Sequence, residues 1–146
     1  MAHSFPPSEA PLQVRVLAPE SAPVPSPDLR RLFAGQRLTR ARRLHLAQCP
    51  RIVAEHNGRP LGLAVYEQVG DELRVHEIGI DATTASGPRG VADLLLDALE
   101  LACVAGGGRR LVLTPRVLSL APDVGRRGYL PAAERHAGGW LQKTLA

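Results

Sequence analysis

The sequence predicts a single α/β (α+β) domain whose central sheet of six to seven strands is mixed and mostly antiparallel, with about four flanking helices. Three observations predict it. A strand is followed by two helices, three strands are joined by tight turns, and a long apolar helix leads into a short apolar strand. The chain of 146 residues has the length of one ordinary domain. Its 45% hydrophobic and 22% charged residues are typical of a globular protein.

The first half of the chain predicts a tail, a strand, two helices and an antiparallel meander. Alternating apolar and polar residues indicate strands, apolar residues at helical spacing indicate helices, and Gly or Pro separates them. Asn57-Gly58 is a strong hairpin signal, because its turn type needs a positive φ at both positions. The predicted order is a loose tail at 1–11, then one domain over 12–146 that begins with a strand at 12–17, helices at 26–34 and 38–47, and strands at 51–56, 61–69 and 73–80.

The second half predicts a helix between two parallel strands. The helix has a broad apolar face from Val91 to Ala105 and is ended by three glycines. The strand at 110–114 is short and apolar, as in the centre of a sheet. A helix placed between two strands implies that they pair in parallel through a right-handed crossover. The predicted order closes with a short helix at 117–124 and a hairpin formed by 129–135 and 140–144.

Charge and cysteine content narrow the functional classes. The net charge is +4, and Lys143 is the only lysine, so arginine supplies nearly all of the positive charge. Such an arginine bias reflects genome composition, which makes nucleic acid an unlikely partner. Cys49 and Cys103 are far apart and indicate free thiols, and the histidines show no metal-ligand spacing, so we expect no metal. Without an apolar signal segment or spanning stretch, the chain is expected to be cytoplasmic and away from membranes.

The turn Gly87–Ala92 is the best candidate for a binding site. The first N–H groups of a helix have no intrahelical partner, and the helix dipole adds positive charge there. Small residues let a phosphate approach these groups closely, and Arg89 can add a charge-assisted hydrogen bond. The alternative is that Gly87-Pro88 and Gly90 only shape a tight turn.

The element order and this turn resemble the GNAT superfamily of acyl-CoA-dependent N-acetyltransferases, over roughly residues 12 to 145. The family pattern is Gln/Arg-x-x-Gly-x-Gly/Ala after a strand that ends in a branched apolar residue. Gly90 and Ala92 match it, as does Ile80 at the strand end, whereas Gly87 replaces the Gln or Arg. The resemblance implies an acetyl-CoA cofactor bound by Ile78, Gly79, Ile80, Gly87, Pro88, Arg89, Gly90, Val91 and Ala92.

The resemblance also implies transfer of the acyl group to a primary amine of a small molecule or peptide by direct attack. This chemistry needs a proton acceptor and an acid for the leaving thiolate. Glu77 is the favoured base, although it could simply pair with an arginine on an adjacent strand. His76 precedes it and is expected on the opposite side of the sheet. The family's acid is often a tyrosine a few residues before a Gly-aromatic pair. Here the pair is Gly128-Tyr129 and the position four residues before it is Val124, so Tyr66 or Tyr129 would have to replace that acid, and Tyr129 is the candidate carried forward.

Two other hypotheses stay open. Gly87 and Val124 favour a catalytically degenerate module of the same fold that binds CoA or another anion as a sensor. The arginine-rich helices at 28–47 favour a basic interaction domain, or a surface that selects an acidic acceptor. A homodimer through the C-terminal hairpin is common in the resembling family.

Overall fold

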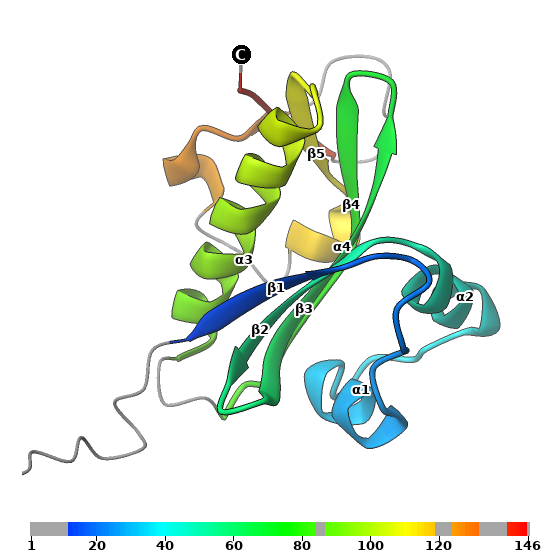
Figure 1. Cartoon of the computed structure of the whole chain (residues 1–146). Helices are drawn as coiled ribbons and strands as arrows, with labels where there is room; N and C mark the ends of the chain where they lie inside the picture. Colours follow the sequence, from blue (N-terminus) through cyan, green and yellow to red (C-terminus); the bar gives the residue numbers. More distant parts are fainter. Residues whose placement is uncertain (1–11, 84–86, 119–123, 132–139, 146) are drawn as a thin grey trace, which may run out of the picture.

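The computed structural model describes residues 12–83, 87–118, 124–131 and 140–145, so the predicted tail at 1–11 lies outside the described residues. Its strands form one sheet in the order β1-β2-β3-β4-β5-β7-β6. Helix α3 covers one face of the sheet, and α1 and α2 cover the other (Figure 1). The neighbouring strands pair antiparallel except β4 and β5, which confirms the mixed, mostly antiparallel sheet.

The elements follow the predicted order as far as β5; most of the predicted helix at 117–124 and of the predicted strand at 129–135 lies outside the described residues. The elements are β1 Gln13–Leu17, α1 Ser26–Leu32, α2 Arg40–Gln48, β2 Arg51–His56, β3 Arg59–Val69, β4 Glu72–Ile80, α3 Gly87–Ala105, β5 Arg110–Leu113, α4 Pro115–Leu118, the 3-10 helix η2 Val124–Arg127, β6 Leu130–Pro131 and β7 Leu141–Thr144. Among the described residues only the helices α1, α2 and α3 are longer than four residues, which is one fewer than the four helices expected. α3 begins four residues before the predicted start at Val91.

Two tight turns build the meander of β2, β3 and β4. Asn57 and Gly58 both have positive φ values, 51° and 78°, which confirms the predicted hairpin. Gly70 has a φ of 61° in the turn between β3 and β4. Between β4 and β5 the chain crosses over through α3, and the two strands pair in parallel as predicted.

The pairing between β4 and β5 is short. It joins Glu72–Val75 to Arg110–Leu113, after which the chain leaves the sheet and forms α4 beside β4. Thr114 makes the last contacts, with its N–H 3.4 Å from the carbonyl oxygen of Val75. Among the described residues no strand pairs with the second half of β4 on this side. The sheet therefore opens between β4 and β5.

A β-bulge in β4 changes which side chains face α2. Val65 is opposite Glu77 while Tyr66 is opposite Val75, so His76 is the extra residue. Val75 and Ile78 both lie in the core under α3, and the two residues between them face α2. The expectation that His76 and Glu77 lie on opposite sides is wrong, because strict alternation holds only in a strand without a bulge.

Two apolar clusters hold the helices on the sheet. The larger lies under α3, and the smaller joins α1 and α2 to the centre of β2 and β3. Phe33 of the smaller cluster lies against β4 at Gly79, where an added Cβ would be 2.7 Å from the ring. Gly79 is therefore required for the close approach of α1 to the open half of β4.

Replacing Gly79 with alanine should destabilise the fold, because the new methyl group would push the Phe33 ring out of its cluster. Overpacking of this kind costs about 1–3 kcal/mol. The urea midpoint should fall accordingly. Gly125→Ala is the matched control, since nothing lies within 4 Å of a Cβ there. Equal midpoints for the two variants would contradict the packing described.

Candidate functional site

The predicted phosphate-binding turn forms the first turn of α3. Because the helix begins at Gly87, the N–H groups of its first turn have no partner within the helix. Gly87 and Arg89 supply such groups, while Pro88 has no N–H to offer. This places two main-chain donors and the positive end of a 19-residue helix at one point.

The last residues of the predicted turn anchor the helix. The side chains of Val91 and Ala92 are buried in the core, whereas Gly90 is exposed. Gly62 of β3 leaves room for Val91, since a Cβ there would lie 2.5 Å from Val91 Cγ1. In helical geometry the N–H groups of Val91 and Ala92 reach back four residues, so these two residues position the helix start on the sheet.

The main chain of β4 offers hydrogen-bonding groups along its open edge. The Asp81 N–H donates to the carbonyl of Leu61 at 2.9 Å. Main-chain groups alternate in direction along an antiparallel pair, so those of Gly79 point toward β3 and those of Ile78 and Ile80 point the other way. That direction is the side from which β5 has departed. An extended ligand could pair there as an added strand, and α3 is the next regular element along the chain.

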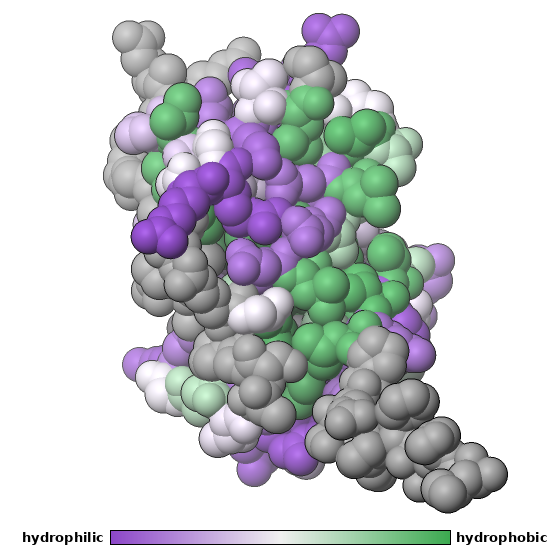
Figure 2. Space-filling view, turned by 90° about the vertical axis from the view of Figure 1, so that its left-hand side faces the viewer, coloured by the Kyte–Doolittle hydropathy of each residue, from purple (hydrophilic) through white to green (hydrophobic). Residues whose placement is uncertain are grey.

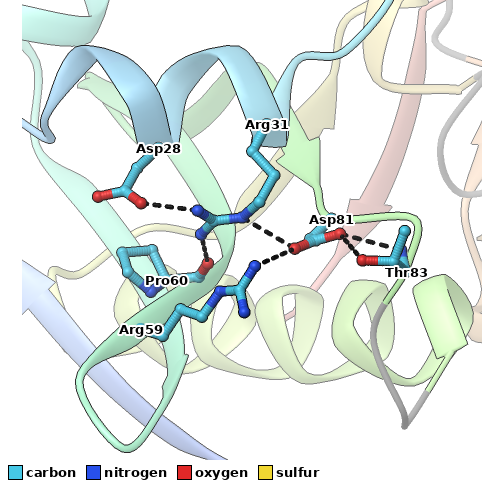
Figure 3. Close-up of polar contacts among 6 residues, drawn as sticks. All are labelled: Asp28, Arg31, Arg59, Pro60, Asp81 and Thr83. Carbon is cyan, nitrogen blue, oxygen red and sulfur yellow. Dashed lines mark hydrogen bonds and ion pairs between the residues drawn. The ribbon is translucent and has the colours of Figure 1, made fainter.

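Asp81, at the end of β4, is the centre of a polar network that sequence reasoning missed (Figure 3). Its carboxylate is 2% exposed and accepts from Arg31 Nε at 2.9 Å. It also accepts from the N–H and hydroxyl of Thr83, at 2.9 and 2.7 Å. Arg31 continues to the carboxylate of Asp28 and the carbonyl of Pro60. The network ties α1 and the β2–β3 hairpin to the segment that leads into α3.

The hydrogen bonds determine the ionisation of Asp81. Burial acts to raise the pKa of this carboxyl, but the donors Thr83 and Arg31 lower it below its ordinary value. The more distant Arg59, 3.8 Å away, adds a further positive charge. The carboxylate therefore stays ionised well into the acidic range.

Asp81→Asn should lower the unfolding free energy at pH 7 by about 1.5–3 kcal/mol, the value of hydrogen bonds to a charged group. An unfolded Asp has a pKa of about 3.9, so its stabilisation is complete above that pH and is lost as pH falls through the lower folded value. The unfolding free energy of the variant should therefore fall less in acid than that of the wild type. Urea unfolding from neutral to acidic pH measures both effects. The exposed Glu20→Gln is the control, and a variant as stable as wild type at pH 7 would contradict the assignment.

Glu77 is held by an arginine of α2 rather than of an adjacent strand. The carboxylate is 1% exposed, and Arg42 contacts both of its oxygens at 2.6 to 3.2 Å. The guanidinium also donates to Gln36 Oε1 and to the carbonyl of Arg37, so it is fixed in turn. This ion pair anchors α2 to β4 at the bulge.

His76 lies beside Glu77 on the α2 side and is packed against a second imidazole. Its ring stacks on that of His45, with the centroids 5.0 Å apart and an interplanar angle of 18°. Glu67 of β3 lies 3.8 Å from His76 Nε2. The bulge and the long-range contact with α2 create this arrangement, and neither leaves a signal in the local sequence.

Tyr129, the predicted replacement acid, lies in the core under α3. It is 2% exposed, and within the described part of the chain its hydroxyl has no hydrogen-bond partner. Burial, and next the charge of Glu100, raises the pKa of Tyr129 above its ordinary value. Since Glu77 faces α2, the structure does not bring the two predicted catalytic residues together.

Val124 is also a core residue. It is 5% exposed, begins η2 and belongs to the cluster under α3. Its carbonyl accepts from the Tyr129 N–H at 3.3 Å, which fixes the approach to β6. Packing explains the apolar residue at this position.

The pairing of charged side chains differs between the α3 face of the sheet and the face covered by α1 and α2. On the α3 face, hydrophilic side chains gather in a band (Figure 2). There Arg127 contacts Asp93, Asp97 and Glu100, and Glu100 also contacts Lys143.

On the opposite face, Asp28 is the only acid between residues 26 and 49. Arg31 forms an ion pair with Asp81 and Arg42 forms one with Glu77, and both of these acids are buried. The remaining arginines of this region are exposed and have no acidic partner within the described residues; they are Arg30, Arg37, Arg40 and Arg43.

The described residues offer neither a metal site nor a membrane-spanning helix. They contain no group of three His, Cys, Asp or Glu side chains arranged to hold a metal ion. They also contain no helix with the length and apolarity needed to cross a membrane.

Solved structures share this architecture along nearly the whole chain. A putative GNAT-family acetyltransferase from Desulfovibrio desulfuricans matches with a TM-score of 0.64 and 14% identity over 93% of this chain and 100% of its own. The chain has the GNAT fold. The IAA acetyltransferase from Bacillus cereus matches with a TM-score of 0.66 and 13% identity, over 92% of this chain and 100% of that one.

A third GNAT-fold match carries ligands. N-acetylglutamate synthase from Neisseria gonorrhoeae, complexed with coenzyme A and N-acetyl-glutamate, matches with a TM-score of 0.66 and 16% identity over 94% of this chain. The chain spans about a third of that synthase, 36% of its length. No family model and no curated protein matches the sequence. The shared feature is thus the fold.

Proposed function

We propose that this chain is an N-acetyltransferase that uses acetyl-CoA. One observation carries the proposal: β4 has an open edge, and the next regular element along the chain is α3, whose first turn offers unpaired N–H groups. Main-chain groups of Ile78 and Ile80 suit an extended pantetheine arm, and the N–H groups of Gly87 and Arg89 suit the pyrophosphate.

The matched structures support an acyl-transfer reaction. Each is an acetyltransferase or synthase by name, and one contains coenzyme A together with an acetylated amino acid. The proposed reaction transfers the acetyl group from the thioester sulfur to a primary amine of a small molecule or peptide. Direct attack suits the placement of the thiols, because Cys49 and Cys103 are both buried and burial raises the pKa of each.

Gly90→Asp should weaken acetyl-CoA binding roughly tenfold or more, equal to ~1.4 kcal/mol, because its carboxylate would repel the phosphates. An acidic residue in the first turn interacts favourably with the helix dipole and stabilises the helix, so the loss of affinity would not come from helix unfolding. Calorimetry measures the affinity. Gly125→Asp adds the same charge at an exposed, open position and should bind like the wild type.

Two outcomes would contradict the proposal in different ways. Wild-type binding of acetyl-CoA without thiol release on any amine would favour the degenerate sensor module. No binding at all would favour the basic interaction domain or another function. A cytoplasmic location and a homodimer through β6 and β7 stay predictions.

The exposed arginines of α1, α2 and the segment between them favour an acceptor that carries a negative charge. Arg37→Gln, Arg40→Gln and Arg43→Gln combined should raise KM for glutamate several-fold and change KM for glutamine little, because the two acceptors differ only in charge. Thiol-release assays at low salt measure this difference. Arg109→Gln with Arg126→Gln removes exposed arginines elsewhere and is the control. Equal effects on both acceptors would contradict the charge preference.

A further inference from the structure

One imidazole lies where the sheet opens. His76 is the extra residue of the β4 bulge, and its carbonyl oxygen is 3.4 Å from Thr114 Oγ1, next to the last contact between β4 and β5. Its side chain is 17% exposed and lies on the α2 side of the sheet. A ligand in the opening would therefore end beside a partly accessible imidazole.

His45 holds this ring from the side of α2. Its imidazole is stacked nearly parallel on His76, and the residue itself is exposed. The stack limits rotation of the His76 ring.

The groups around His76 keep it neutral. Burial, and next the charge of His45, lowers the pKa of His76 below its ordinary value. Glu67 on β3 and Glu77 on β4 act in the opposite direction, and Arg74 adds to the lowering. At pH 7 the ring therefore has a free lone pair with which to accept a proton.

Glu77, the carboxylate next to it, is poorly suited to the same role. Arg42 of α2 engages both of its oxygens and is itself fixed by two further acceptors. Protonation of Glu77 would leave this largely enclosed guanidinium, whose side chain is 12% exposed, without its counter-charge, which is costly. A neutral imidazole carries no such cost.

We propose that His76 accepts the proton of the acceptor amine and that His45 is its positioning residue. This rests on the proposed acetyltransferase function. An N–H proton of the ammonium passes to the imidazole, and the amine nitrogen then bonds to the thioester carbonyl carbon. The carbon–sulfur bond breaks, a second N–H proton passes to the thiolate, and the imidazolium releases its proton to solvent. The products are the acetylated amine, the free thiol and one proton.

The test measures acetyl-CoA affinity and the pH dependence of kcat/KM in the wild type, His76→Gln, His45→Ala and the control His56→Gln. His76→Gln should bind acetyl-CoA normally but lose roughly 100-fold or more in kcat/KM, the usual size of acid–base catalysis. Because the base must be neutral, wild-type kcat/KM should fall as pH drops through the pKa of His76, below the ordinary histidine value. His56 lies at the end of β2, and its variant should match the wild type.

His45→Ala separates positioning from simple structure. Removing the ring exposes His76 and removes a neighbouring charge, so both effects should raise its pKa and move the acidic limb to higher pH. NMR titration of the His76 ring in the protein alone should show the same upward shift. A merely structural role would leave the position of the limb unchanged.

The outcomes distinguish the two proposals. A wild type that acetylates an amine, with His76→Gln retaining full kcat/KM and the same acidic limb, overturns the assignment of His76 alone. A wild type that transfers no acetyl group to any amine overturns the proposed function, and this inference with it. Loss of the limb in His76→Gln, together with its shift in His45→Ala, supports the inference.

Discussion

The early end of β5 is the constraint on which the candidate site depends. Thr114-Pro115 directly follows the strand, and proline has no N–H with which to continue a ladder. Proline is well suited to the first position of a helix, and α4 begins there. The second half of β4 is therefore left with an open edge. The proposed binding of the pantetheine arm depends on this edge, because only unpaired main-chain groups can bind an extended ligand as a strand.

Two arginines connect the small helices to that open half of β4. Arg31 of α1 contacts Asp81 and Arg42 of α2 contacts Glu77, so each helix is fixed at one end of the segment from the bulge to the loop. Ion pairs of this kind add little net stability, because desolvation offsets much of the attraction. They do favour one arrangement over others, since a displaced partner leaves a buried charge uncompensated. Part of the basic character of this region is thus architectural, and only its exposed arginines are free to meet a ligand.

Local signals in the sequence were enough to predict most of the fold. Asn57-Gly58 predicted a hairpin, and the apolar helix before a short strand predicted the parallel crossover. The bulge could not be predicted, because it depends on the register between β3 and β4, which no local pattern specifies. The ion pair of Glu77 joins residues 35 positions apart, and that of Asp81 joins residues 50 apart. Such contacts become visible only when the sheet has brought its helices together.

The bulge also changes what the apolar residue at position 124 implies. Val124 lies in the core under α3, so the absence of a hydroxyl there is explained by packing. A protein acid is not required when the attacking amine supplies the proton that the thiolate needs. The proposed reaction then needs a single proton acceptor, and the bulge places the His76 imidazole on the α2 side of the sheet. On this argument the lack of the family's tyrosine leaves acyl transfer chemically complete, with β4 rather than the C-terminal segment providing the group that moves the proton.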